Sequence, residues 1–133
     1  MYNRFMTIRH VNVPGLARLP QFSHATIAGN QVFVAGIIGA PPGEDGPVAG
    51  GAGPESRQIL VNMLHVLDTC GCTMADVAMV HVYLTDMDDF PAMNEVYTEL
   101  VGGEPPGRIT VGCTALALDA KVEMDCVAFL PDA

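Results

Sequence analysis

Arg108 has the residue type and the setting of a carboxylate-binding group. It is one of only six lysines and arginines in 133 residues, and it follows the rigid segment 105–107 (Pro-Pro-Gly), which directs the backbone at this point. A guanidinium holds a carboxylate through two parallel hydrogen bonds, so this arginine suits an anchor for a small anionic molecule. The common alternative is a surface arginine paired with one of the fifteen acidic residues, an interaction that contributes little.

Glu123 is the second candidate for chemistry, because it lies between Val122 and Met124 in an apolar strand. By alternation it shares a face of that strand with Lys121 and Asp125. A carboxylate in a cleft between subunits orients a water molecule or passes a proton. The alternative is the solvated, polar side of an edge strand, which is the more common setting.

The other titratable and nucleophilic residues form no recognisable catalytic or metal-binding motif. The four histidines lack HxH or HExxH spacing, and Cys70-Gly-Cys72 is too tight for CxxC metal or redox motifs. Ser23 and His24 are neighbours on an expected strand and therefore face opposite ways. The glycine-rich stretch 49–53 lacks the GK[ST] of a phosphate loop. We therefore expect no metal site and reduced thiols.

Length and composition limit the classes of protein to which the chain can belong. Its length predicts a single domain over residues 1–133. Half of the residues are hydrophobic and 16% are charged, so we expect some apolar surface to be buried between subunits. A net charge of −9 without a Lys/Arg stripe disfavours nucleic acid as a partner. No apolar run approaches the ~18 residues of a membrane span, and the first residues do not resemble a signal peptide, which predicts a cytoplasmic protein without a membrane partner.

Periodicity and turn residues predict an α+β protein with a mixed sheet and both helices on one face. The expected order is β-β-β-α-β-α-β-β, with the strand over 31–38 (QVFVAGII) buried on both faces. The glycine- and proline-rich segment 39–54 is long for a loop and is expected to form a rim or lid. The expected strands are 7–13, 24–28, 31–38, 76–86, 109–116 and 121–130, and the helices run from Pro54 to Gly71 and from Asp88 to Gly102.

Spaced motifs in a fixed order resemble the RidA/YjgF family of enamine/imine deaminases over roughly residues 20 to 130. Residues 84–97 resemble the family's strand-to-helix signature, with LTDMDDF followed by NEVY. The other matches are Val32-Phe33-Val34-Ala35-Gly36 with V-F-x-[SA]-G, Gln58 and Asn62 with the first-helix pattern, Pro106-Gly107-Arg108 with P-x-R, and Val122-Glu123-Met124 with V-E-[IM].

The resemblance implies a chorismate-mutase-like fold and a homotrimer with three clefts shared between subunits. It also implies cofactor-independent hydrolysis of 2-imino and 2-enamino acids to 2-keto acids and ammonia. Arg108 matches the arginine that grips the substrate carboxylate, and Glu123 matches the acid that positions the water. Thr110 stands where several members have a cysteine whose backbone contributes to the pocket. The remaining residues expected at the substrate site are Phe22, Gly36 and Asn94.

The chain departs from the family's pattern at two polar positions. The family's G-P-Y-S-Q-A appears as residues 19–25 (LPQFSHA), where Phe22 replaces the tyrosine, and S-G-Q-I-P appears as residues 35–39 (AGIIG), which lack the glutamine. These losses favour an alternative, a non-catalytic trimeric module that binds a small carboxylate metabolite. The retention of Glu123 disfavours it, because a carboxylate binder gains nothing from a second anion. A ribonuclease activity fits poorly with a chain of charge −9.

Overall fold

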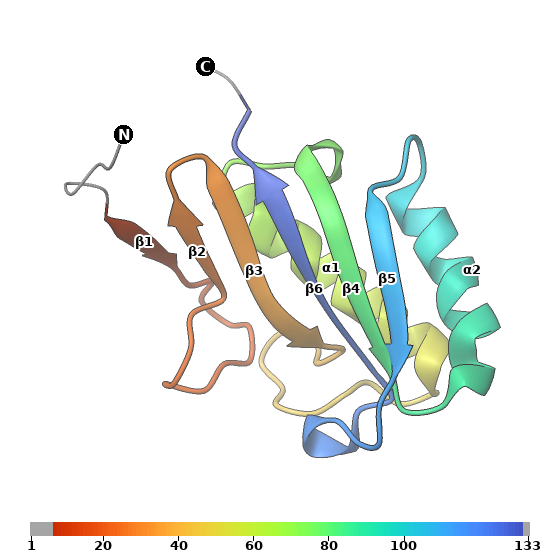
Figure 1. Cartoon of the computed structure of the whole chain (residues 1–133). Helices are drawn as coiled ribbons and strands as arrows, with labels where there is room; N and C mark the ends of the chain where they lie inside the picture. The colour runs from red at the N-terminus through yellow and green to blue at the C-terminus, as the bar shows by residue number, and fades with distance from the viewer. Residues whose placement is uncertain (1–6, 132–133) are drawn as a thin grey trace.

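The computed structural model describes residues 7–131, and its strands and helices follow one another in the predicted order (Figure 1). Every strand except the one over 31–38 is shorter than expected, and the largest differences arise because the segments 12–13, 85–86 and 113–116 lie outside the strands. No helix within residues 7–131 is long and apolar enough to cross a membrane. The elements are β1 (Ile8–Val11), β2 (Ala25–Ala28), β3 (Gln31–Ile38), α1 (Ala52–Thr69), β4 (Val77–Leu84), α2 (Phe90–Val101), β5 (Gly107–Gly112) and β6 (Val122–Phe129).

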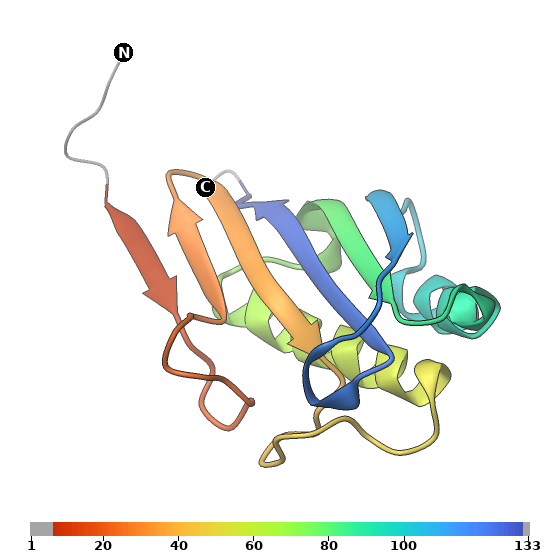
Figure 2. The same ribbon diagram turned by 60° about the horizontal axis from the view of Figure 1, so that its bottom comes forward.

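The strands form one six-stranded mixed sheet in the order β1-β2-β3-β6-β4-β5. β4 and β5 are parallel, and all other neighbours are antiparallel. Because β3 and β4 both run antiparallel to β6, they point the same way, and α1 connects them as α2 connects β4 to β5. Crossovers of one hand place both helices on the same face of the sheet (Figures 1 and 2).

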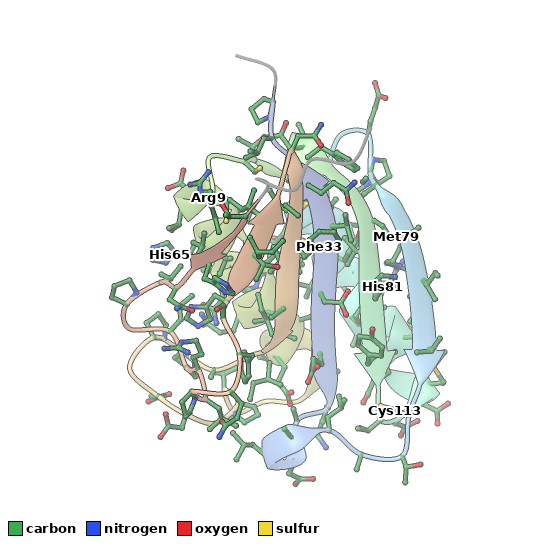
Figure 3. All side chains as sticks on the ribbon, turned by 60° about the vertical axis from the view of Figure 1, so that its left-hand side comes forward. Arg9, Phe33, His65, Met79, His81 and Cys113 are labelled. Atoms are coloured by element: carbon green, nitrogen blue, oxygen red, sulfur yellow. The ribbon has the colours of Figure 1, made fainter. Side chains whose placement is uncertain are left out.

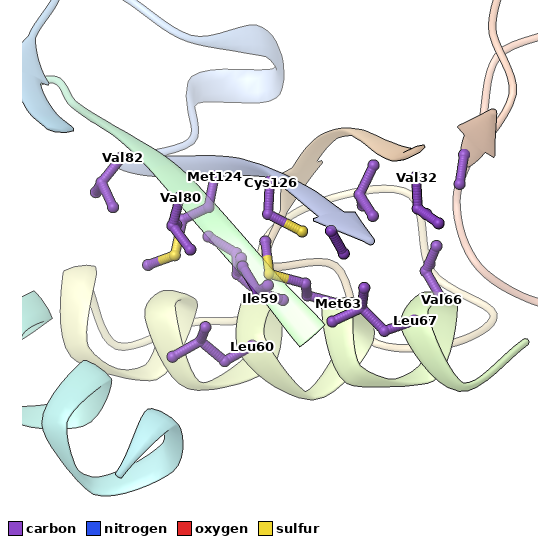
Figure 4. Close-up of a cluster of buried hydrophobic side chains, with 14 of the residues drawn as sticks. Val32, Ile59, Leu60, Met63, Val66, Leu67, Val80, Val82, Met124 and Cys126 are labelled. Carbon is purple, nitrogen blue, oxygen red and sulfur yellow. The ribbon is translucent and has the colours of Figure 1, made fainter. Parts of the chain in front are cut away.

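The hydrophobic core lies between α1 and the sheet (Figure 4). The apolar residues of α1 recur at helical spacing, face inward and pack on alternate residues of the central strands. α1 ends as the sequence predicted: Gly71 has a φ of 86°, its N–H donates to the Asp68 carbonyl, and the Cys72 N–H donates to the Leu67 carbonyl. Core side chains with no exposed surface include Ile59, Leu60, Met63, Val66, Leu67, Val32, Val80, Val82 and Met124.

The opposite face of the sheet is not covered within the chain. Val32 and Val34 of β3 point to the helices, whereas Phe33 between them is 40% exposed, so the expectation of a strand buried on both faces is wrong for a single chain. The physical reason is that only one side of this mixed sheet carries helices. Phe33 and His81 mark this open face in Figure 3. Ile109 and Val111 of β5 are exposed on the same face, at 50% and 41%.

The loop of the segment 39–54 spans residues 39–51, because α1 begins at Ala52, and hydrogen bonds within it and to the rest of the chain make it a fixed rim. The Gly43 N–H donates to the Gly15 carbonyl (2.8 Å), and the Val48 N–H donates to the Gly39 carbonyl (2.8 Å). The Asn62 side-chain amide of α1 donates to the Ala40 carbonyl (2.8 Å).

The buried Glu55 of α1 holds the ends of two strands together. Its carboxylate accepts a hydrogen bond of 2.9 Å from the Lys121 N–H, immediately before β6. Its backbone lies against Gly39, immediately after β3. Because Gly36 and Glu123 lie close to these two points, Glu55 sets the relative position of the segments that carry them.

Replacement of Gly39 by alanine tests this close approach. A Cβ at Gly39 would stand 2.6 Å from the Glu55 carbonyl oxygen, whereas a Cβ at Gly46 in the same loop would meet no atom within 4 Å. We expect Gly39→Ala to lower the free energy of unfolding by about 1–3 kcal/mol. Gly46→Ala is the matched control and should change stability by less than about 1 kcal/mol. Urea denaturation measures both, and equal stabilities would contradict the packing described.

Candidate functional site

Arg108 lies at the second position of β5 and points to the helix-covered side of the sheet, because it is in register with the buried Val80. Its guanidinium carbon lies 4.6 Å from the centre of the Tyr97 ring and 5.4 Å from the centre of the Phe90 ring. Stacking on aromatic faces favours a cation and restricts its orientation. Within residues 7–131 no carboxylate pairs with Arg108, so the alternative of an ordinary surface ion pair is wrong.

A cleft of about 450 Å³ opens beside the guanidinium, between α2 and the segment before β5. Asn94 lines this cleft together with Arg108, and its side-chain amide adds a second polar group. No acidic side chain lines it, so Arg108 supplies the local charge despite the net charge of −9. The full lining is Asn94, Tyr97, Thr98, Val101, Gly102, Gly103, Pro105, Pro106 and Arg108.

Tyr97 is a residue of this cleft that the sequence analysis did not single out as functional. It is buried, its hydroxyl has no hydrogen-bond partner within residues 7–131, and burial raises its pKa while Arg108 opposes that rise. The spacing of Asn94 and Tyr97, three residues apart on one helix face, was a signal that could have identified it. Its ring is the nearer of the two aromatic faces under the guanidinium.

Glu123 lies in the centre of the sheet, because β6 is hydrogen-bonded to β3 on one side and to β4 on the other. The interpretation as a solvated edge strand is therefore wrong. Its register with Tyr83 places it on the open face of the sheet. The carboxyl group lies directly against Gly36, and its Cδ would be only 3.1 Å from a Cβ at that position. The missing side chain of Gly36 therefore leaves room for the carboxyl group.

Burial raises the pKa of Glu123, and the nearby Asp125 carboxylate raises it further. Asp125 itself is held by His81 Nδ1 and by the Tyr83 hydroxyl, which donates at 2.9 Å. Nothing within residues 7–131 donates a hydrogen bond to the Glu123 carboxylate. A carboxyl group in this setting takes up and releases protons closer to neutral pH than an ordinary glutamate.

Glu123, Gly36 and Phe22 line one cleft of about 680 Å³ at the end of β3. The loop that carries Phe22 is held by Arg18, whose Nη1 donates to the Phe22 carbonyl (2.8 Å). The buried His24 organises the same loop, since its Nδ1 accepts from the Val13 N–H (2.8 Å). Its other nitrogen donates to the carbonyl of residue 17 (3.1 Å). Both ring nitrogens are thus occupied, which makes His24 a structural residue.

The structure divides the predicted site residues between two places in the chain. Phe22, Gly36 and Glu123 share one cleft, and Asn94 and Arg108 share another. Arg108 and Glu123 point to opposite faces of the sheet. Thr110 points to the same face as Arg108, in register with Val82, but lines neither cleft.

Comparison with known proteins shows the family of the chain. The profile of the family described as Endoribonuclease L-PSP matches residues 15–130. The chain belongs to this family, which is also called the YjgF/RidA family. The α+β fold predicted from the sequence is confirmed, since the structure of yeast Mmf1 has a TM-score of 0.88 with 29% identity and covers 94% of this chain and all of that one.

Relatives of the chain include named deaminases. A RutC family protein of Pyrococcus horikoshii is 39% identical over 108 residues, which are 81% of this chain and 86% of that protein. The 3-aminoacrylate deaminase RutC of Acinetobacter baylyi is 34% identical, over 83% of this chain and 87% of that protein. A 2-iminobutanoate/2-iminopropanoate deaminase of Dermatophagoides farinae is 33% identical, over 82% and 85%. The family therefore contains imine and enamine deaminases.

No cluster of three or more histidine, cysteine, aspartate or glutamate side chains that could hold a metal ion is found in the described part of the chain. The cysteines at 70, 72, 113 and 126 are free thiols. Burial raises the pKa of Cys126 to about 12, which keeps this thiol protonated and unreactive.

The raised pKa of Glu123 predicts how stability depends on pH. Below the ordinary glutamate pKa the carboxyl group is neutral in the folded and unfolded chains, so Glu123→Gln should change stability little. As pH rises, the unfolded chain ionises freely while the folded chain resists ionisation, so the wild type loses stability relative to Glu123→Gln. Thermal unfolding should therefore show a gain for the variant at about pH 7–8 that fades toward about pH 3–4.

Glu104→Gln is the matched control, because it removes one negative charge at an exposed position of the loop after α2. A gain for Glu123→Gln that is independent of pH, or equal to that of Glu104→Gln, would contradict the electrostatic explanation.

Proposed function

We propose that this chain hydrolyses 2-imino acids and their enamine tautomers to 2-keto acids and ammonia. The observation that carries the proposal is the half-buried Glu123 carboxyl, without a donor among residues 7–131 and with a raised pKa, in a predominantly apolar cleft. Such a group suits proton transfer, whereas a carboxylate that served only stability would be paired. The unpaired, aromatic-backed Arg108 supplies the complementary anchor. The deaminase names of two relatives support the same reaction class.

We propose further that the active site forms between chains of a homotrimer. Arg108 and Glu123 point to opposite faces of one sheet, so a site that uses both needs residues of two chains. The open face carries the exposed apolar residues Phe33, Ile109 and Val111. Its contact with further copies of the chain would bury this surface and bring one chain's Glu123 toward the next chain's Arg108.

In this site Arg108 binds the substrate carboxylate through charge-assisted hydrogen bonds. The rings of Tyr97 and Phe90 restrict the guanidinium, so less conformational entropy is lost when the substrate binds. Asn94 lies in the same cleft and is available to a carboxylate or imine group. Fixing the carboxylate fixes the position of the adjacent C2 carbon, which lowers the entropic part of the barrier.

Glu123 then promotes attack by water on that carbon. The carboxylate accepts a proton from the water as its oxygen bonds to C2 of the protonated imine, and the electron pair of the C=N double bond moves to the nitrogen, which becomes a neutral amine. Glu123 returns this proton to the nitrogen, and the C–N bond breaks as the C2 carbonyl forms. The proton of the C2 hydroxyl passes to the Glu123 carboxylate and then to the departing ammonia, so the products are the keto acid and ammonium. Water and the imino acid are the only reactants, so no oxidant or other co-reactant enters the reaction.

Two other functions fit the residues less well. A non-catalytic carboxylate binder would gain from Arg108, but it has no use for a second carboxyl group in its binding cleft. The family's description names an endoribonuclease, yet the chain has six lysines and arginines against fifteen acidic residues. A polyanionic RNA backbone needs a positive surface to overcome such a field.

Single substitutions test the roles of Arg108 and Glu123. 2-Iminobutanoate is released from threonine by a pyridoxal-phosphate dehydratase, and a second 2-imino acid is produced from leucine by an amino-acid oxidase with catalase. We expect the protein to accelerate keto-acid formation. Arg108→Ala should lower kcat/KM by about 10–100-fold and Glu123→Gln by about 100-fold or more. Arg57→Ala is the control, because it removes an exposed arginine that pairs with Glu99 at 2.7 Å.

The Glu123→Gln variant distinguishes the deaminase from the non-catalytic carboxylate binder. In a deaminase, Glu123→Gln loses turnover while calorimetry still detects binding of the 2-keto acid. Normal turnover by this variant would contradict the mechanism. A failure of the folded wild type to accelerate either reaction, with unimpaired binding of the keto acid, would favour the non-catalytic binder.

Mixing the two inactive variants tests the shared site. In a trimer whose sites each take Arg108 from one chain and Glu123 from the next, co-refolded Arg108→Ala and Glu123→Gln chains should regain roughly one quarter of the wild-type activity. Each variant refolded alone is the control. If mixing restores no activity although sedimentation shows mixed trimers, the two residues do not share a site.

A further inference from the structure

We infer that the substrate carries a large apolar side chain, branched aliphatic or aromatic, in place of the methyl or ethyl group of 2-iminopropanoate or 2-iminobutanoate. This inference rests on the proposed function, because it assigns the substrate class of the same site. The large cleft beside Glu123 supports it, because its lining is mostly apolar and includes one leucine with a left-handed backbone.

The cleft offers a substrate mostly apolar surface. Of its polar lining residues, Arg18 donates to the Leu19 and Phe22 carbonyls, and both ring nitrogens of His24 are bonded to backbone. Asn62 donates to the Ala40 carbonyl and accepts from a neighbouring side chain. Apart from Glu123, the remaining acidic lining residue is the exposed Asp45 at the loop. The large apolar side chains of the lining are Leu16, Leu19, Phe22, Ile37, Ile38, Val66 and Leu118.

Two side chains of this cleft, Phe22 and Ile37, are purely apolar. Neither can donate or accept a hydrogen bond, and both line the same cleft as Glu123. A ligand group that packs against them therefore needs no hydrogen-bonding partner.

Leu118 lies in the cleft lining in an unusual backbone conformation. Its φ is 56°, and Asp119 follows with a φ of 57°, although a left-handed backbone is uncommon for residues other than glycine. Leu118 is also 62% exposed, so hydrophobic burial within the chain does not explain its position. Strained residues tend to persist where the surrounding structure and a ligand use their geometry. A substrate side chain packed against Leu118 would cover this exposed surface.

The size of the cleft agrees with this substrate class. Its volume of about 680 Å³ lies within the roughly 300–1,000 Å³ typical of pockets for small molecules. A methyl group would leave most of the apolar lining in contact with water. A leucine-like or phenylalanine-like side chain would displace that water, and this gain favours the larger substrate.

The experiment compares kcat/KM across a series of 2-imino acids. A broad amino-acid oxidase with catalase produces the imino acids of alanine, 2-aminobutanoate, leucine, methionine and phenylalanine, and semicarbazide traps whatever imine remains. We expect kcat/KM for the leucine- or phenylalanine-derived imine to exceed that for the alanine-derived imine by about tenfold or more. The double variant Phe22→Tyr/Ile37→Gln should lower this ratio, and Leu118→Ala should lower it by about tenfold.

Val61→Ala is the matched control, because it shortens an exposed apolar residue on the outer side of α1 and should leave the ratio unchanged. Thermal unfolding of each variant excludes loss of the fold as a cause. Equal or faster turnover of the small imines by the wild type overturns the inference and leaves the deaminase function intact. No acceleration of any imine overturns the deaminase function itself, so the two failures are distinguishable.

Discussion

Both helices cover the same face of the sheet, and this one-sided layering decides where each candidate functional residue lies. Side chains alternate between the two faces of a strand, so a single residue step moves a group from the core to the open face. On β5 this alternation directs Arg108 toward the helices and Ile109 away from them. On β6 it directs Glu123 to the open side, while Val122 and Met124 fill the core. The separation of the two reactive groups follows from this geometry.

The chain places its polar groups in two different electrostatic settings. Glu55, although buried, accepts a backbone hydrogen bond and joins the ends of β3 and β6, so its polarity is used for structure. Glu123 is half-buried without a donor among residues 7–131, and burial raises its pKa. Burying an unpaired charge costs free energy, and groups with such perturbed pKa values cluster at functional sites. Gly36 leaves room for the Glu123 carboxyl group, because a Cβ at this position would clash with it.

The environment of Arg108 differs from that of Glu123, because it favours the charged form of the guanidinium. Aromatic rings, and no acid of the described chain, contact its guanidinium, so the positive charge remains available to a ligand. This local cation acts in a chain of net charge −9, where long-range attraction of an anion is absent. In the proposed function, recognition of a carboxylate would therefore depend on short-range contacts within the cleft. The apolar lining around Glu123 would act by the same principle, through shape and burial of an apolar group.

Local pattern was sufficient for the order of the elements, because helices, strands and the turns between them, such as the helix end at Gly71, depend on neighbouring residues. It was also sufficient to identify Arg108, Glu123 and Asn94 as candidates through their motifs. Strand ends were less accurate, since β5 begins two residues earlier than expected and ends at Gly112, where the chain turns away. The expectation that Phe33 would be buried was wrong, because the hydrophobicity of a strand does not show what covers each of its faces.

The sequence by itself thus determined which elements form, in which order, and which residue types stand at the motif positions, because these depend on interactions between residues close along the chain. Only the tertiary structure decided the strand order, the central place of β6 and the opposite directions of Arg108 and Glu123. It also decided the stacking of Tyr97 under Arg108 and the left-handed backbone at Leu118. These features depend on contacts between segments far apart in sequence, whose pairing and register no local pattern specifies.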